Sequence, residues 1–252
     1  MLARRVAKIG GNELDRPEWV AACARALKRV EPLVVVHGGG QAITNWSKRL
    51  GLPVEKRDGV RVTTPEVAAV VEMVLSGPIN RQVVTALRAA GIDAVGLSGV
   101  DGGLLTARRA AGDLGHVGEI TGVRAPLLES LLLAGLTPVI APVAPDGGGV
   151  PFNVNADQAA SAVAAALGAQ ELLLISDVPG VQVSGRTQQE LMVTDIEGLI
   201  ASGVAKDGMA AKLRAAVGAL AGGARAVRIG DLSLFDGPAA GTRVVAPVTQ
   251  PA

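Results

Sequence analysis

Short apolar runs rich in β-branched residues alternate along the chain with longer segments of helical periodicity. The pattern begins with a strand-like run at 6–9, continues with a helical segment at 17–29 and then returns to a strand-like run at 33–36. Such alternation predicts strands that are connected through helices, and therefore a mainly parallel sheet. The sequence thus predicts the α/β class, with an open, mainly parallel sheet sandwiched by helices.

A second helical segment opens at Thr64 and Pro65 and carries a valine stripe. Valines recur there at spacings of three and four residues, at Val67, Val70, Val71 and Val74. This spacing places them on one face of a helix, which has to be buried against the core or a second subunit.

Glycine pairs interrupt the helical period between residues 101 and 124. Two strand-like segments remain there, at 104–108 and 116–121. They favour hairpins that lie over one edge of the sheet.

The last third of the chain again alternates between helical and strand-like segments. A helical run at 155–167 precedes a continuous apolar run at 171–175. Helices are predicted after Asp195 and over 208–221, and strands at 226–229 and 243–245. We place a boundary between two lobes near Gly168, which gives segments 1–168 and 169–252.

Composition narrows the classes of function. The 252 residues include 24 Lys and Arg against 23 Asp and Glu, so the net charge of +1 gives no footprint for nucleic acid or an anionic membrane. The most apolar stretch, 125–143, is interrupted by Glu129, Gly135, Pro138 and Pro142, which argues against a membrane span. Without a signal peptide, we expect a cytoplasmic protein.

The single Cys23 lies within the first helical segment. One cysteine excludes an intramolecular disulfide and leaves too few thiols for a zinc or iron–sulfur site. We therefore expect a buried, structural thiol.

Two glycine clusters follow the first two strands. Gly10 and Gly11 end the first strand, and Gly38, Gly39 and Gly40 separate the second from a helix at 41–50. Glycines at such turns let backbone N–H groups approach an anion, and a helix N-terminus adds favourable partial charge. The clusters indicate a phosphate cradle, although tight turns in a glycine-rich chain are the alternative. The P-loop and Rossmann glycine fingerprints are both missing.

Two later helix starts carry charged residues. Asp207 and Gly208 open a helix that we expect to carry Lys212 in its first turn, where the dipole disfavours a cation. A bound anion would explain this lysine, and a solvated surface position is the alternative. Asn155 is a candidate N-cap, and Asp157 enters an otherwise small and apolar helix as either a capping or a catalytic carboxylate.

Taken in order, these motifs resemble the N-acetylglutamate kinase branch of the amino-acid kinase superfamily. The similarity extends from Lys8 to Arg243. It rests on the segments 8–11, 37–40, 59–63, 153–158, 176–180 and 207–209 together with Lys212.

The resemblance implies a role for each matching residue. Lys8 and Lys212 would contact the transferring phosphoryl group, and Asp157 would hold the two lysines. The substrate-binding residues implied in this way are Gly38, Gly39, Arg61 and Asn153. The implied ATP-binding residues are Gly10, Gly11, Gly40, Asp177, Val178, Gly180, Val204, Lys206 and Met209. The segment 1–168 would bind the amino-acid substrate and form a homodimer, and 169–252 would bind ATP.

The implied reaction needs little acid–base chemistry. A γ-carboxylate with a pKa of about 4.3 is already ionised at neutral pH, so positioning and charge neutralisation carry the catalysis. Only two histidines are present, His37 and His116. His37 adjoins the glycines and could be a packing or hydrogen-bonding residue. No carboxylate cluster suggests a protein-built metal site, so magnesium is expected to arrive with ATP, as Mg-ATP.

The resemblance implies N-acetylglutamate and ATP as substrates. Two alternative functions remain open. One is a kinase of carrier-protein-linked aminoadipate in lysine biosynthesis, although a nearly neutral chain offers little basic surface for an acidic carrier. The other is a catalytically silent sensor of the same fold. The resemblance also implies a dimer with weak or no arginine feedback, because the chain begins almost at its first strand.

Overall fold

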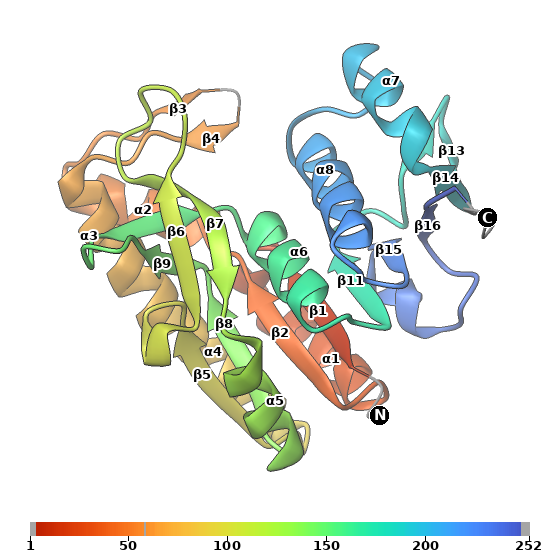
Figure 1. Cartoon of the computed structure of the whole chain (residues 1–252), viewed down its shortest axis with the longest axis horizontal. Coiled ribbons are helices and arrows are strands. Elements are labelled where there is room, and N and C mark those ends of the chain that lie inside the picture. The colour runs from red at the N-terminus through yellow and green to blue at the C-terminus, as the bar shows by residue number, and fades with distance from the viewer. Residues whose placement is uncertain (1–3, 58, 248–252) are drawn as a thin grey trace.

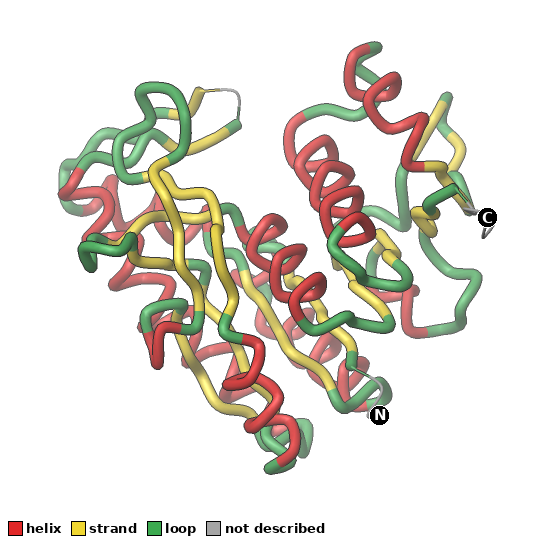
Figure 2. The backbone as a smooth tube through the Cα atoms, viewed as in Figure 1, coloured by secondary structure: helices red, strands yellow, loops and turns green. Residues whose placement is uncertain are grey.

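A computed structural model of the chain describes residues 4–57 and 59–247. Its centre is an eight-stranded sheet of order β14-β16-β15-β11-β1-β2-β8-β5, seen in Figures 1 and 2 as neighbouring strands between layers of helices. The strands are β1 (Arg5–Ile9), β2 (Leu33–His37), β5 (Ala94–Ser98), β8 (Thr137–Ala141), β11 (Glu171–Ile175), β14 (Glu190–Met192), β15 (Val227–Gly230) and β16 (Thr242–Val245). Every ladder is parallel except that between β15 and β16, which confirms the predicted class.

The two faces of the sheet bury separate sets of alternating residues. Val6 and Val34 point into a core that includes residues of the helices α5, α6 and α8. Ala7 and Val35 point into the opposite core, which includes residues of α1, α3 and α4. Because both faces are covered, the central strands are continuously apolar. The helices are α1 (Pro17–Lys28), α2 (Gly40–Arg49), α3 (Pro65–Val74), α4 (Asn80–Ala89), α5 (Ala125–Leu133), α6 (Ala156–Ala166), α7 (Ile196–Ala201) and α8 (Asp207–Ala221).

The predicted valine stripe belongs to the core. All four valines of α3 are buried, and the Thr64 hydroxyl caps the helix by accepting from the Val67 N–H. A π-helical turn (Leu75–Ile79) then joins α3 to α4. Shorter 3-10 turns are η1 (Glu13–Asp15), η3 (Asp101–Gly103), η4 (Val193–Asp195) and η5 (Leu232–Phe235).

The predicted hairpin is part of a larger second sheet. β6 (Leu105–Arg109) and β7 (Val117–Val123) pair antiparallel as expected, and β10 (Pro151–Val154) then adds to β7 in parallel and to β9 (Val143–Pro145) antiparallel. The hairpin is therefore more than an edge cover. Two small ribbons complete the strands, β3 (Lys56–Arg57) with β4 (Val60–Arg61), and β12 (Gln182–Val183) with β13 (Arg186–Thr187).

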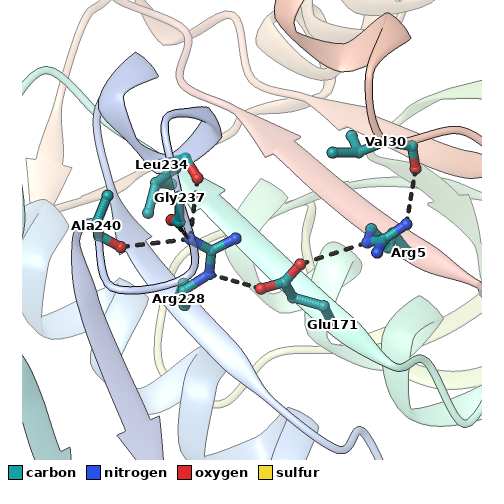
Figure 3. Close-up of polar contacts among 7 residues, drawn as sticks. All are labelled: Arg5, Val30, Glu171, Arg228, Leu234, Gly237 and Ala240. Carbon is teal, nitrogen blue, oxygen red and sulfur yellow. Dashed lines mark hydrogen bonds and ion pairs between the residues drawn. The ribbon is translucent and has the colours of Figure 1, made fainter.

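A buried arginine joins the last part of the chain to the centre of the sheet (Figure 3). Arg228 on β15 donates from Nε to Glu171 Oε1 at 2.6 Å, and Arg5 on β1 lies 3.5 Å from Glu171 Oε2. Nη1 of Arg228 donates to three carbonyls that follow β15, those of Leu234, Gly237 and Ala240. The Arg228 guanidinium thus holds together the pairing of β11 with β15 and the loop that follows β15.

Replacing Arg228 by alanine should destabilise the fold by about 3 kcal/mol, because the half-buried Glu171 carboxylate and the carbonyls of the loop beyond β15 lose the donor that they share. Urea unfolding measures this change. Arg225→Ala, at an exposed neighbouring position, is the matched control and should cost less than about 0.5 kcal/mol. Equal stability of the two variants would contradict a structural role for the Arg228 network.

Candidate active site

The two predicted glycine clusters meet where β1 and β2 end side by side. The Gly38 N–H donates to the Ile9 carbonyl at 2.9 Å. A Cβ added at Gly38 would lie 2.9 Å from the Gly11 nitrogen, and one added at Gly11 would overlap the Gly39 nitrogen. The turns therefore touch backbone to backbone, which only glycine permits. Within the described residues, the N–H groups of Gly11, Gly39 and Gly40 have no hydrogen-bond acceptor.

A cavity of about 1060 Å³ opens in front of these turns. Its wall includes residues from β1, the β3–β4 ribbon, β7, β10, α6 and α8. The predicted site residues that line it are Lys8, Gly11, Gly38, Gly39, Gly40, Arg61, Asn153, Asp157 and Lys206. The structure thus brings together residues that are far apart in the sequence.

Lys8 and Asp157 form an ion pair at the bottom of the site. Lys8 Nζ lies 3.0 Å from Asp157 Oδ1, and only 5% and 6% of the two residues is exposed. The contact lacks the alignment of a hydrogen bond, so Asp157 Oδ1 has no hydrogen-bond partner. The predicted N-cap positions this carboxylate, because Asn155 Oδ1 accepts from the Asp157 N–H at 2.8 Å. Asp157 can therefore accept further donors.

Lys212 lies in the second turn of α8, which corrects the expected first turn. The helix begins at Asp207, one residue earlier than predicted, and Lys212 is its sixth residue. The dipole argument for a bound anion is weaker there. Lys212 does not line the cavity, and its Nζ lies 3.8 Å from where a Gly208 Cβ would be.

The charge environment of Lys212 nevertheless belongs to the same cluster. Burial lowers the pKa of Lys212, and the positive charge of Lys8 lowers it further. The carboxylates of Asp157, Glu13 and Asp177 act in the opposite direction. Lys8 and Lys212 thus lie close enough for their charges to interact, and both are near Asp157.

Arg61 on β4 is buried with part of its guanidinium unused. Its Nη2 donates to the Gly40 carbonyl at 2.9 Å and to the Thr44 hydroxyl at 2.7 Å. Its Nη1 is buried without a partner, and burial lowers the pKa of the side chain. A guanidinium with free donors that lines a cavity is suited to a carboxylate.

Thr63 connects Arg61 to Asn153. Its hydroxyl donates to the Arg61 carbonyl at 3.0 Å and accepts from Asn153 Nδ2 at 3.2 Å. Because the Asn153 amide uses its nitrogen for Thr63, its oxygen remains available to accept a hydrogen bond. Thr63 belongs to the motif 59–63, in which only Arg61 was predicted to have a function.

The predicted ATP contacts are divided among several places. Asp177 lines a smaller cavity of about 290 Å³ together with Glu13, Trp19 and Asp231. Lys206 lines the main cavity, and Gly10 packs against the Glu13 carboxylate. The predicted ATP-binding residues that line neither cavity are Gly10, Val178, Gly180, Val204 and Met209.

In residues 4–57 and 59–247, no three His, Cys, Asp or Glu side chains are arranged to hold a metal ion. Cys23 is buried as expected, and burial together with the nearby Glu13 raises the pKa of its thiol to about 12. Among the helices of the described segments, none is both long and apolar enough to cross a membrane.

The glycine turns, Lys8 and Asp157 line one cavity at the ends of β1 and β2 in an α/β fold, and comparison with known proteins identifies the class of protein. The model of the amino acid kinase family matches residues 3–231. The chain therefore belongs to the amino acid kinase family.

Relatives narrow this class. The acetylglutamate kinase of Chloroflexus aurantiacus is 49% identical over 244 residues, which cover 94% of this chain and 95% of the relative. The acetylglutamate kinase of Geobacillus kaustophilus is 46% identical, with 85% and 84% covered. These relatives place the chain among the acetylglutamate kinases and confirm the predicted resemblance.

Solved structures confirm the fold. The smu.665 protein of Streptococcus mutans has a TM-score of 0.87 at 29% identity, with 97% of this chain and 99% of that chain covered. The carbamate kinase of Giardia lamblia bound to AMP-PNP has a TM-score of 0.72 at 16% identity, with 97% and 98% covered. The second similarity concerns the fold alone.

Proposed function

We propose that this chain transfers the γ-phosphoryl group of ATP to the γ-carboxylate of N-acetyl-L-glutamate and forms N-acetyl-L-glutamyl 5-phosphate, a step of arginine biosynthesis. The observation that supports this reaction best is the buried Lys8–Asp157 pair beside two interlocked glycine turns, in a chain similar to acetylglutamate kinases. Bringing two anions together is the main electrostatic problem of such a transfer.

The two lysines reduce the repulsion between these anions. The attacking carboxylate is already ionised at neutral pH and needs no general base. Lys8 neutralises charge on the transferring group from the side of β1, and Lys212 does so from α8. Asp157 keeps both ammonium groups oriented. When phosphate oxygens bind, the lysines exchange part of their contact with Asp157 for contact with these oxygens. The N–H groups of the glycine turns stabilise the same developing charge.

The amino-acid substrate binds beside the β3–β4 ribbon. The free Nη1 of Arg61, with its neighbouring nitrogen, takes a carboxylate in a forked pair. The Asn153 oxygen accepts from the N–H of the acylated amino group. Gly38 and Gly39 approach the carboxylate that is phosphorylated.

ATP binds between the glycine turns and the segment 169–252. Gly10, Gly11 and Gly40 face its phosphates, and Lys206 lies on the cavity wall. The remaining nucleotide contacts are Asp177, Val178, Gly180, Val204 and Met209. Magnesium would arrive bound to the nucleotide, where it would neutralise charge on the phosphates.

We further propose a cytoplasmic homodimer in which the segment 1–168 holds the amino-acid substrate and the subunit contact. The valine stripe of α3 is not that contact, because it is buried in the subunit's own core. Sedimentation of the purified protein measures the association state. A monomer at working concentrations would contradict the dimer.

Trapping of the acyl phosphate tests the reaction. With Mg-ATP and hydroxylamine, N-acetylglutamate should yield hydroxamate, whereas glutamate, aspartate and N-acetyl-aminoadipate should yield little. Preferential turnover of the aminoadipate compound would favour the lysine-biosynthesis alternative. No turnover of any substrate would favour the silent sensor, although the retention of Lys8, Lys212 and Asp157 argues against it.

Thr63→Val should raise the KM for N-acetylglutamate by about tenfold and leave the KM for ATP unchanged. The substitution keeps the shape of the side chain but removes the hydroxyl that orients Asn153 and the Arg61 carbonyl, and one hydrogen bond contributes about 1 kcal/mol. Steady-state kinetics with each substrate varied separately checks this split. Thr194→Val, at an exposed position, is the matched control.

A further inference from the structure

His37 is a buried titratable residue that the proposed reaction does not use. It ends β2 directly before the glycine turn and has an exposed fraction of 0%. Both of its ring nitrogens are engaged. Nδ1 lies 2.9 Å from the Gly38 carbonyl oxygen, and Nε2 lies 3.1 Å from Asn80 Nδ2.

The surroundings of Asn80 fix the orientation of its amide. Arg81 Nη2 lies 2.6 Å from Asn80 Oδ1, and Asn80 Nδ2 lies 2.9 Å from the Val139 carbonyl oxygen. A guanidinium can only donate, and a backbone carbonyl can only accept. Asn80 therefore presents a donor, not an acceptor, to His37.

This orientation determines where the His37 proton resides. Since Asn80 donates to Nε2, that nitrogen is the acceptor of a neutral ring, and Nδ1 carries the proton that is donated to Gly38. Burial supports the neutral form by lowering the pKa of His37 to about 4. The chain of donors from Asn80 through His37 to Gly38 has one direction only.

The hydrogen bond from His37 to the Gly38 carbonyl fixes the orientation of the peptide between Gly38 and Gly39. In a trans peptide the carbonyl and the following N–H point in opposite directions. Holding the Gly38 carbonyl toward His37 thus turns the Gly39 N–H away from it, and this N–H has no acceptor within the described residues. Glycine cannot restrict its own backbone, so an external contact is needed to keep the donor aimed.

We propose that Asn80 and His37 are positioning residues that hold the Gly38–Gly39 peptide with its N–H ready for an anion in the cavity. The kinetic part of this inference rests on the proposed phosphoryl transfer, whereas the predicted proton position does not. Neither side chain touches the substrate in this arrangement. They act through the backbone donor that does.

Imidazole nitrogen-15 NMR of the wild-type protein tests the proton position without any substitution. The chain has two histidines, so the half-buried His116 provides an internal reference. We expect His37 near neutral pH to be neutral, with a protonated Nδ1 and an unprotonated Nε2. A protonated Nε2, or a charged ring, would overturn the proposal.

A matched pair of substitutions tests the effect on catalysis. His37→Asn places an amide nitrogen at the same number of bonds from Cβ as Nδ1, and so keeps a donor for Gly38. His37→Gln places it where Nε2 was and loses that donor, although glutamine fills the space better. We expect kcat to fall about tenfold or more further in H37Q than in H37N, with the KM for ATP similar. Equal kcat values, or a more active glutamine variant, would contradict a positioning role, since pure packing favours the larger side chain.

The contribution of Asn80 is tested in the same way. Asn80→Ala should lower kcat about tenfold and allow a mixture of His37 tautomers, because nothing then donates to Nε2. Arg88→Gln, on the exposed side of the same helix, is the control and should retain wild-type kcat. An unchanged kcat and a single tautomer in N80A would remove Asn80 from the proposal. Absence of acyl phosphate with the wild-type protein would instead contradict the proposed function and leave the NMR result standing.

Discussion

Lys8→Met should lower kcat by about two to three orders of magnitude while changing the KM values little, the size of effect seen when one preorganised donor to a developing charge is removed. Methionine keeps the unbranched stem in a site where only 5% of Lys8 is exposed. The ammonium matters most where charge is greatest, in the transition state. Single-turnover measurements of acyl phosphate formation give the chemical step directly.

Loss of the Lys8 charge also leaves Asp157 buried beside Lys212 alone, so the thermal stability of the variant has to be measured in parallel. Lys212→Met should behave like Lys8→Met, and Lys48→Met, at an exposed position on α2, should not. A folded Lys8 variant with near-normal kcat would refute the assigned roles.

Arg61→Lys should raise the KM for N-acetylglutamate by about tenfold to a hundredfold and spare that for ATP. Lysine cannot reproduce the forked pair with a carboxylate, and a hydrogen bond to a charged group contributes about 1.5–3 kcal/mol. The loss is greater than for Thr63→Val, because Arg61 also donates to the Gly40 carbonyl at 2.9 Å and thereby braces the glycine turn. Isothermal titration with N-acetylglutamate separates binding from turnover.

Arg108→Lys is the matched control, because Arg108 is an exposed arginine that pairs with Glu119 and does not itself line the cavity. It should leave both KM values unchanged. If R61K and R108K bind N-acetylglutamate equally well, the carboxylate lies elsewhere in the cavity.

Local sequence patterns predicted the elements that depend on local preferences. The strand at 171–175 has the predicted bounds, and the valine stripe of α3 is buried as its period requires. The two glycine turns could also be recognised, since glycine is needed where backbones touch. The second sheet could not be recognised in full, because β10 joins β7 through pairing between residues distant in the sequence.

In the candidate site, too, local patterns predicted some features, whereas contacts between distant residues determine others. Lys212 was expected in the first turn of a helix that begins at Gly208, but it is the sixth residue of a helix that begins at Asp207, where the backbone has a left-handed φ of 46°. The roles of Thr63, Asn80 and the buried Glu13 depend on hydrogen bonds and burial across the fold. No local pattern marks such positions.

The continuity of the main sheet has a consequence for unfolding. β1 is paired on one side with β2 and on the other with β11, which lies beyond the proposed lobe boundary at Gly168. One of the two cores likewise includes residues from Val6 to Val244. The segments 1–168 and 169–252 can therefore bind different substrates without unfolding as separate cooperative units. Calorimetry should show a single heat-absorption peak for the subunit, with equal calorimetric and van't Hoff enthalpies, instead of two resolved transitions.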